Sequence, residues 1–268
     1  MKKYLLALLG LVALIGVLVV MMNKPPPLPP LPQPNGYDDL VKAGRIVVPF
    51  ETANLTDLKV EELRTRVTAN QESLLLARAG LGRECRVALD FSTQDLSISN
   101  HIAQVSSFKA LARAFLAEGS LAERENRPAD AARAYLDAVR LGHECCRGGV
   151  VIDRMVGAAC QTLGCRALEG MIEKLPAADC REAVRQLEEL HAKAGTLEAV
   201  FQQEYLWARR TSGLRGQIAM LLMRSSQEQV RQKMREKAQA NQQEVRQLLT
   251  QLETRAAERE ITPGGGKP

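Results

Sequence analysis

The sequence predicts an all-α protein: an N-terminal transmembrane helix, a proline-rich stalk, an irregular domain of α-hairpins and a long C-terminal helix. Three observations lead to this fold class. Aromatic residues make up only 4% of the 268 residues, a low share for a protein built on sheets. Apolar residues recur at helical spacing through most of the chain after the stalk. From Thr196 onward, no proline interrupts the chain until Pro263.

The N-terminal segment is typical of an uncleaved membrane anchor. Residues 1–3 include two lysines, and the nineteen residues 4–22 carry no charge. As a helix this run is about 28 Å long, close to the thickness of the hydrocarbon layer. It ends in bulky Val and Met followed by Pro25, whereas a signal peptidase needs small residues, so a cleaved signal peptide is the alternative. The positive-inside rule places residues 1–3 in the cytoplasm and the C-terminal domain outside it, in the periplasm if the protein is bacterial.

Residues 23–36 form the expected linker. Seven of the ten residues 25–34 are proline, which favours a polyproline II helix with a rise of about 3.1 Å per residue. We interpret this segment as a semi-rigid spacer. A docking strip for a proline-recognising domain is the alternative.

A helical domain is expected over residues 37–225. After a short first helix, Thr56 or Asp57 is expected to cap a second one, whose apolar stripe is broken by Gly80 and Gly82. The polar stretch that begins at Asp90 is rich in residues that bond their own backbone, and it is predicted to be a loop.

Two further helices form the most strongly patterned part of the domain. The first runs from Ser99 to about Asn126, and Pro128 stands at the first turn of the second, which is expected to stop at Gly142. The apolar residues of these two helices recur on one face of each: Val105, Phe108, Ala112, Phe115, Ala131, Tyr135, Ala138 and Leu141.

Residues 110–143 resemble one degenerate tetratricopeptide repeat, a helix–turn–helix unit of 34 residues with interlocking small and large positions. The matching positions are Phe115, Gly119, Ala131, Tyr135 and Ala138. Glu118 departs from the pattern where an apolar residue is usual, and His143 departs from it where a proline is usual. The resemblance implies a surface for protein–protein interaction. We expect the residues that carry it to be structural rather than to touch a partner.

A second hairpin is indicated by an internal echo. When Asp130 is aligned with Asp179, apolar residues coincide at three later positions: Tyr135 with Val184, Ala138 with Leu187, and Leu141 with Leu190. The spacing of about 49 residues exceeds the repeat length of the family, so we expect two stacked but irregular hairpins over residues 99–194.

Residues 226–262 are predicted to form a long polar helix. Its apolar residues are mostly 3, 4 or 7 positions apart, and Asn241 falls within this stripe. The helix is expected either to pack on its own domain or to form a coiled coil with another chain. Residues 263–268 are expected to be a disordered tail.

The six cysteines leave three interpretations open. They are Cys85, Cys145, Cys146, Cys160, Cys165 and Cys180. In an extracytoplasmic domain an even number of cysteines suggests disulfides, of unknown pairing here, but ordinary buried thiols are the alternative. His143, Cys145 and Cys146 are also weak candidates for metal ligands, although no second pair of ligands completes a tetrahedral site.

No recognised catalytic motif occurs in the sequence, neither a nucleophile elbow, a zinc-protease helix, a phosphate loop nor a dinucleotide fingerprint. His101, His143 and His191 lie near or late in expected helices, where the helix dipole alone can favour them. We therefore expect no enzyme activity and no cofactor, and no small-molecule substrate is inferred. The mild net charge of +5, spread over helix faces, argues against a nucleic-acid partner.

The expected function is that of a membrane-tethered scaffold or protein-interaction protein without catalytic activity. Residues 4–22 would hold it at the membrane, and the exposed Arg and Gln residues of the C-terminal helix would contact a protein partner or a second copy of the chain. The alternatives are a self-associating structural envelope protein and an enzyme whose site is assembled from scattered polar residues. A large polar pocket containing His143 or His101 would favour the enzyme.

Overall fold

The computed structural model describes residues 10, 14, 16, 29–49, 55–89, 96–222 and 224–261. All regular structure in these residues is helical, without a strand, so the all-α fold class is confirmed for them. The expected anchor at 4–22 and the tail at 263–268 lie outside the described residues, apart from residues 10, 14 and 16. No described helix combines the length and apolar character that crossing a membrane requires.

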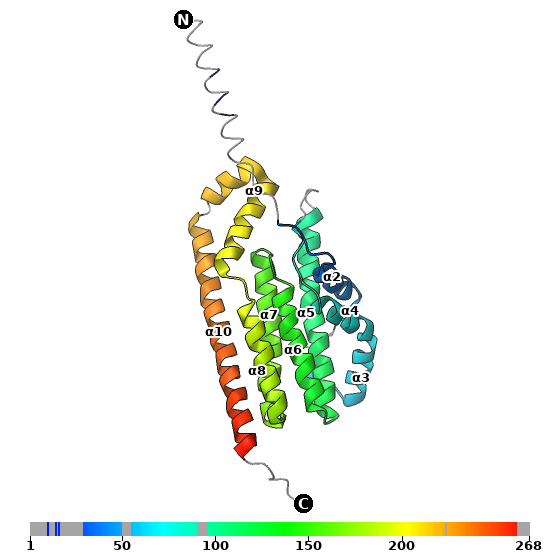
Figure 1. Ribbon diagram of the computed structural model, residues 1–268. Coiled ribbons are helices and arrows are strands. Elements are labelled where there is room, and N and C mark those ends of the chain that lie inside the picture. Colours follow the sequence, from blue (N-terminus) through cyan, green and yellow to red (C-terminus); the bar gives the residue numbers. More distant parts are fainter. Residues whose placement is uncertain are drawn as a thin grey trace, which may run out of the picture.

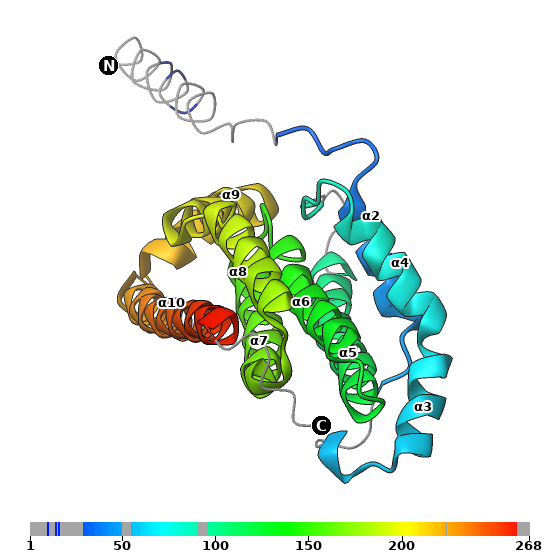
Figure 2. The ribbon, with the colours of Figure 1, turned by 60° about the horizontal axis from the view of Figure 1, so that its bottom comes forward.

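The helices form an array with two flanks (Figure 1). Helices α5, α6, α7 and α8 lie side by side, α2, α3 and α4 cover one side of the array, and α10 packs on α8 and α7 at the other. Figure 2 shows the same order from another direction. The elements are α2 (Gly36–Ile46), η1 (Leu55–Asp57), α3 (Val60–Ala69), α4 (Gln71–Leu81), α5 (Leu96–Arg124), α6 (Pro128–Glu144), α7 (Val151–Glu169), η2 (Ile172–Lys174), α8 (Ala177–Ala192), α9 (Leu197–Leu222) and α10 (Arg224–Ile261).

The linker ends where Asn35 caps α2. The Oδ1 atom of Asn35 accepts hydrogen bonds from the backbone N–H groups of Tyr37, at 3.3 Å, and Arg86, at 2.9 Å. Its Nδ2 donates to the Arg86 carbonyl at 2.8 Å. One buried amide therefore starts the first helix and ties it to the segment that follows α4.

The second predicted helix is divided into α3 and α4, which corrects the prediction in two respects. Thr56 and Asp57 lie in η1, and the N-cap of α3 is Lys59. The division falls at Asn70, which is only 1% exposed. Its side chain accepts a hydrogen bond from the Val48 N–H at 2.8 Å and donates to the Val48 carbonyl at 3.2 Å. The chain thus bends at Asn70, whose side-chain amide satisfies the backbone hydrogen-bonding groups of Val48 in the extended segment between α2 and η1.

The helix break predicted at Gly80 and Gly82 is present, since α4 ends at Leu81 and Gly82 is its C-cap. A Cβ atom at Gly80 would lie 2.7 Å from the Gly36 carbonyl oxygen, well inside normal contact. This glycine therefore permits the close approach of α4 to the start of α2.

The predicted hairpin of α5 and α6 is confirmed. Helix α5 begins slightly earlier than expected, at Leu96, and Pro128 is the first residue of α6. Asn126 takes a positive φ of 58° in the turn, a conformation that Asn tolerates better than most residues. A Cβ atom at Gly119 would lie 2.7 Å from Cδ1 of Tyr135, so the ring occupies the space that glycine leaves. This is the interlocking of small and large positions on which the repeat resemblance rests.

Helix α6 packs more closely on α7 than a side chain would permit at the crossing. Gly142 does not end α6, which continues to Glu144, and this corrects the prediction. A Cβ atom at Gly142 would lie 2.7 Å from Cγ of Gln161, and one at Gly157 would lie 2.9 Å from Cβ of Cys146. The two helix backbones are therefore in contact at this crossing, an arrangement that small residues make possible.

The second predicted hairpin corresponds to α7 and α8. Leu187 and Leu190 of α8 are buried and Val184 is partly buried, in agreement with the internal echo. The apolar residues of α10 join the same core, since Leu248, Leu252 and Ala256 are buried against it. The long C-terminal helix is thus present, and the buried part of its stripe faces its own domain.

We predict that Gly157→Ala destabilises the protein by about 1–3 kcal/mol, because the new methyl group must push α6 away from α7. Gly170→Ala is the control at the C-cap of α7, where the residue has helical backbone angles and its added Cβ would meet nothing nearer than 3.6 Å. Alanine is the better helix former there, so the control should be neutral or slightly stabilising. Chemical denaturation of both variants measures the difference. Equal stabilities would contradict the close crossing.

Candidate functional site

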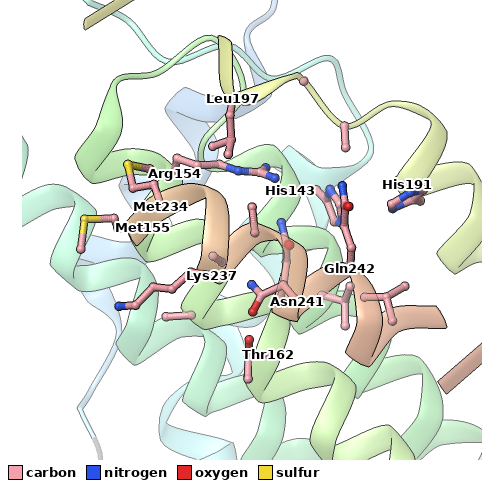
Figure 3. Close-up of a pocket in the computed structure, with 18 of the residues that line it drawn as sticks. His143, Arg154, Met155, Thr162, His191, Leu197, Met234, Lys237, Asn241 and Gln242 are labelled. Atoms are coloured by element: carbon pink, nitrogen blue, oxygen red, sulfur yellow. The ribbon is translucent and has the colours of Figure 1, made fainter. Parts of the chain in front are cut away.

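The principal cavity of the described structure lies between α7, the turn from α8 to α9, and α10 (Figure 3). Its volume is about 470 Å³, within the usual range for sites that bind small molecules. His143 reaches it from the last turn of α6, and His191 reaches it from the last turn of α8. The cavity is therefore lined by residues of five consecutive helices, α6 to α10.

The charged side chains that line this cavity are all cationic or can become so. Arg154 and Lys237 carry full positive charges, and His143 and His191 are the titratable groups. In the part of the chain that the structure describes, no Asp or Glu lines it. A smaller hollow of about 190 Å³ shares His143 and Arg154 with it and adds two more cationic residues, Arg147 and Lys193. The site is consequently a region of positive potential.

Apolar side chains form most of the remaining wall, and neutral polar groups complete it. The apolar residues are Val139, Met155, Ala158, Ala159, Leu187, Leu197, Met234, Ala238 and Val245. The neutral polar residues are Gln161, Thr162, Thr196, Asn241 and Gln242. Few polar groups in a mainly apolar wall are typical of a site that orients one end of a ligand.

His143 is held in its neutral form. Burial is the main cause that lowers its pKa, to about 3, and the positive charges of Arg154, Arg147 and His191 act in the same direction. In Figure 3 the guanidinium of Arg154 extends toward His143. A neutral imidazole offers one donor and one acceptor to whatever occupies the cavity.

His101 lies away from this cavity, in α5. Its Nε2 atom is 2.8 Å from Oδ1 of Asp153, whose side chain is fully buried near the start of α7. The other carboxylate oxygen of Asp153 accepts a hydrogen bond from the Val150 N–H at 2.7 Å. The pair thus ties α5 to the N-terminus of α7, a structural role.

All six cysteines are buried, and each is a free thiol in the structure. Burial raises the pKa values of Cys85 and Cys165 to about 12 and also raises those of Cys146 and Cys180. A hydrogen bond with Cys160, followed by burial, raises the pKa of Cys145. Thiols with a raised pKa stay protonated at neutral pH and are therefore poor nucleophiles.

The weak metal candidates do not converge on one point. Cys145 is buried in the core on the α5 side and hydrogen-bonds with Cys160, whereas Cys146 and His143 line the smaller hollow. Within the described ranges, no three His, Cys, Asp or Glu residues are grouped so that they could hold a metal ion. Among the described residues, the arrangement therefore provides no cluster of ligands for a metal or a metal-dependent cofactor.

Sequence reasoning singled out His143 and noted the polar Asn241 in the apolar stripe of the last helix, and both line the cavity. It missed Arg154, Gln161 and Lys237. The only signal in the sequence for these residues was a polar residue on an otherwise apolar helix face. Such a pattern does not show which residues of other helices the side chain contacts.

Comparison of the chain with protein-family models, with curated proteins and with solved structures gives no match. The resemblance to a tetratricopeptide repeat therefore rests on residues 110–143 alone. The function has to be argued from the geometry and charge of the described residues.

We predict that His143 makes the stability of the protein depend on pH. The unfolded chain takes up a proton near the ordinary pKa of 6.5, whereas the folded protein resists protonation of His143 down to about pH 3. Because the unfolded state binds more protons between these values, the free energy of unfolding should fall as the pH is lowered from 6.5 toward 3. The loss is at most about 1.4 kcal/mol per pH unit.

His143→Gln should remove this contribution, because glutamine is uncharged throughout that range. Urea denaturation of both proteins between pH 4 and pH 7 measures the difference in slope. Parallel pH profiles would show that His143 titrates normally in the folded protein.

Proposed function

We propose that the chain is a membrane-tethered helical adaptor without catalytic activity, and that α9 and α10 provide its contact surface for a protein partner. The observation that carries this proposal is an open surface hollow between the two helices. It is lined by Glu198, Phe201, Gln202, Tyr205, Leu206, Arg231 and Arg235.

The composition of this hollow supports a protein contact. The guanidinium carbon of Arg231 lies 5.2 Å from the centre of the Phe201 ring, and that of Arg235 lies 6.0 Å from it. Tyr205 beside them is 44% exposed. Aromatic residues and arginine are the types most enriched at the energetic centres of protein interfaces, since they combine large contact area with directional polar groups.

The charge of α10 indicates the chemistry of the partner. Arg231, Lys233 and Arg235 fall within five residues that contain no carboxylate. This stretch favours an acidic segment of a partner protein, which would be attracted by long-range electrostatics and then held by the aromatic groups.

The packing of α10 argues against the alternative of an intermolecular coiled coil. Met234, Leu248 and Leu252, which such a coil would use, are buried within the chain. Self-association through these residues would require α10 to leave its own domain. A self-associating envelope protein is therefore the less supported of the two functions.

An anchor at residues 4–22 and a stalk at 23–36 would suit an adaptor, because tethering raises the local concentration of the surface and limits its orientation. A contact of modest affinity is then sufficient.

An enzyme remains a second candidate because the cavity contains His143, but a pKa of about 3 makes this imidazole a weak general base at neutral pH. The described lining includes no Ser, Cys, Asp or Glu to act as a nucleophile or to orient the histidine. The adaptor is therefore the better supported proposal.

We predict that Arg231→Glu, combined with Tyr205→Ala, lowers recovery of the partner roughly 10-fold or more, since it removes two groups of the hot-spot type and reverses one charge. The measurement is chemical cross-linking on intact membranes, followed by purification of the tagged full-length protein and mass spectrometry. Arg246→Glu is the matched control: Arg246 is exposed on the same helix and does not line the hollow.

Loss of one recurrent partner in the double variant, with retention in the control, is the expected result. Recovery of the protein alone would favour the self-associating alternative, and an unchanged partner in the double variant would place the contact elsewhere.

A further inference from the structure

We propose that the cavity between α7, α8 and α10 binds a small amphipathic carboxylate, with its anionic end at Arg154 and its apolar part against the surrounding aliphatic wall. This site is separate from the partner surface at α9 and α10, so either proposal can fail without the other.

The first argument is the missing counter-charge of Arg154. Its guanidinium is half-buried, and the one hydrogen bond that it makes in the described structure is a weak contact of 3.8 Å to the sulfur of Cys146. Arg78, which is also held between helices, instead pairs with both Glu118 and Asp137. Because a partly desolvated cation without a partner is unfavourable, a bound anion would supply the charge that the protein omits here.

The second argument is an unpaired hydrogen-bond donor in the wall of the cavity. Gln161 is only 8% exposed, and its Nε2 atom has no hydrogen-bond partner in the described structure. A buried amide nitrogen without an acceptor costs about 1–3 kcal/mol, so native proteins rarely retain one without a reason. This nitrogen is buried behind the surface of the cavity, so the Gln161 side chain would have to turn before a ligand oxygen could accept from it.

The third argument is that the N-terminus of α9 also adds positive potential to the cavity. Thr196 and Leu197 line the cavity, and Thr196 caps the helix by accepting a hydrogen bond from the Ala199 N–H at 3.2 Å. The positive end of the dipole of a helix of 26 residues is thus beside the cavity, where it favours a negative charge.

The apolar character of the wall favours an amphipathic ion over a free inorganic anion. Val139, Leu187 and Met234 are buried residues whose side chains line the cavity. Inorganic phosphate or sulfate would leave this apolar surface in contact with water. A carboxylate with a short aliphatic chain would cover it, and its planar head matches the fork of one arginine.

The test is isothermal titration of the full-length protein in lipid nanodiscs with octanoate, with empty nanodiscs as the blank. Octanol, octylamine and octyl phosphate serve as neutral, cationic and phosphate probes of the same chain length. We expect octanoate to bind in a 1:1 ratio, and octanol and octylamine to show no saturable binding above the blank.

Three variants locate the site. Arg154→Gln should weaken octanoate binding roughly 10-fold or more, since it removes a charge-assisted hydrogen bond. Lys237→Gln should weaken it by a smaller factor, and Lys233→Gln, an exposed change one turn away that does not line the cavity, should leave it unaltered. The Lys237 and Lys233 variants keep the test valid if Arg154→Gln does not fold.

Absence of octanoate binding, or equal binding of octanol, would overturn the proposal. Equal affinity in the Lys237→Gln and Arg154→Gln variants would overturn the location. Tighter binding of octyl phosphate than of octanoate would overturn the assignment of a carboxylate in favour of a phosphate monoester.

Discussion

The close crossing of α6 and α7 is the constraint on which the other parts of the structure depend. Gly142 and Gly157 bring the two backbones into contact, and the space above Gly142 is taken by Gln161. This contact joins the core shared with α2–α5 to the core shared with α8 and α10. It also directs one face of α7 toward α10, so that Arg154 and Gln161 line a cavity rather than face water. Packing between backbones therefore positions the candidate site.

The two halves of α10 pack differently. Its C-terminal half is anchored by Leu248 and Leu252 in the core beside α8. Its ion pairs with that region, such as Arg166 with Glu244 at 3.0 Å, are exposed and contribute little to stability. The N-terminal half closes the cavity with Met234 and Lys237 and presents other cations outward. One helix thus lies between the cavity and the surface proposed for a partner.

Periodicity was sufficient to predict the helices of residues 99–194 and 226–262, because their apolar faces follow the helical repeat over several turns. It failed at Gly142, where a glycine suggested a stop but instead permits a close approach to α7. The division at Asn70 depends on a hydrogen bond to Val48, 22 residues away, and no local pattern reveals it. The cavity residues were mostly missed for the same reason, since Arg154 and Gln161 acquire their roles only from what α6 and α10 place beside them.

Hydrogen exchange of the full-length protein, followed by mass spectrometry, tests the central role of the α6–α7 crossing most directly. We expect amides in residues 135–142 and 157–164 to exchange more slowly than those of α2, α9 and the first half of α10, because opening that crossing requires both cores to separate. Slower exchange in α10 or α2 than at the crossing would contradict it, since the stability of the domain would then lie elsewhere.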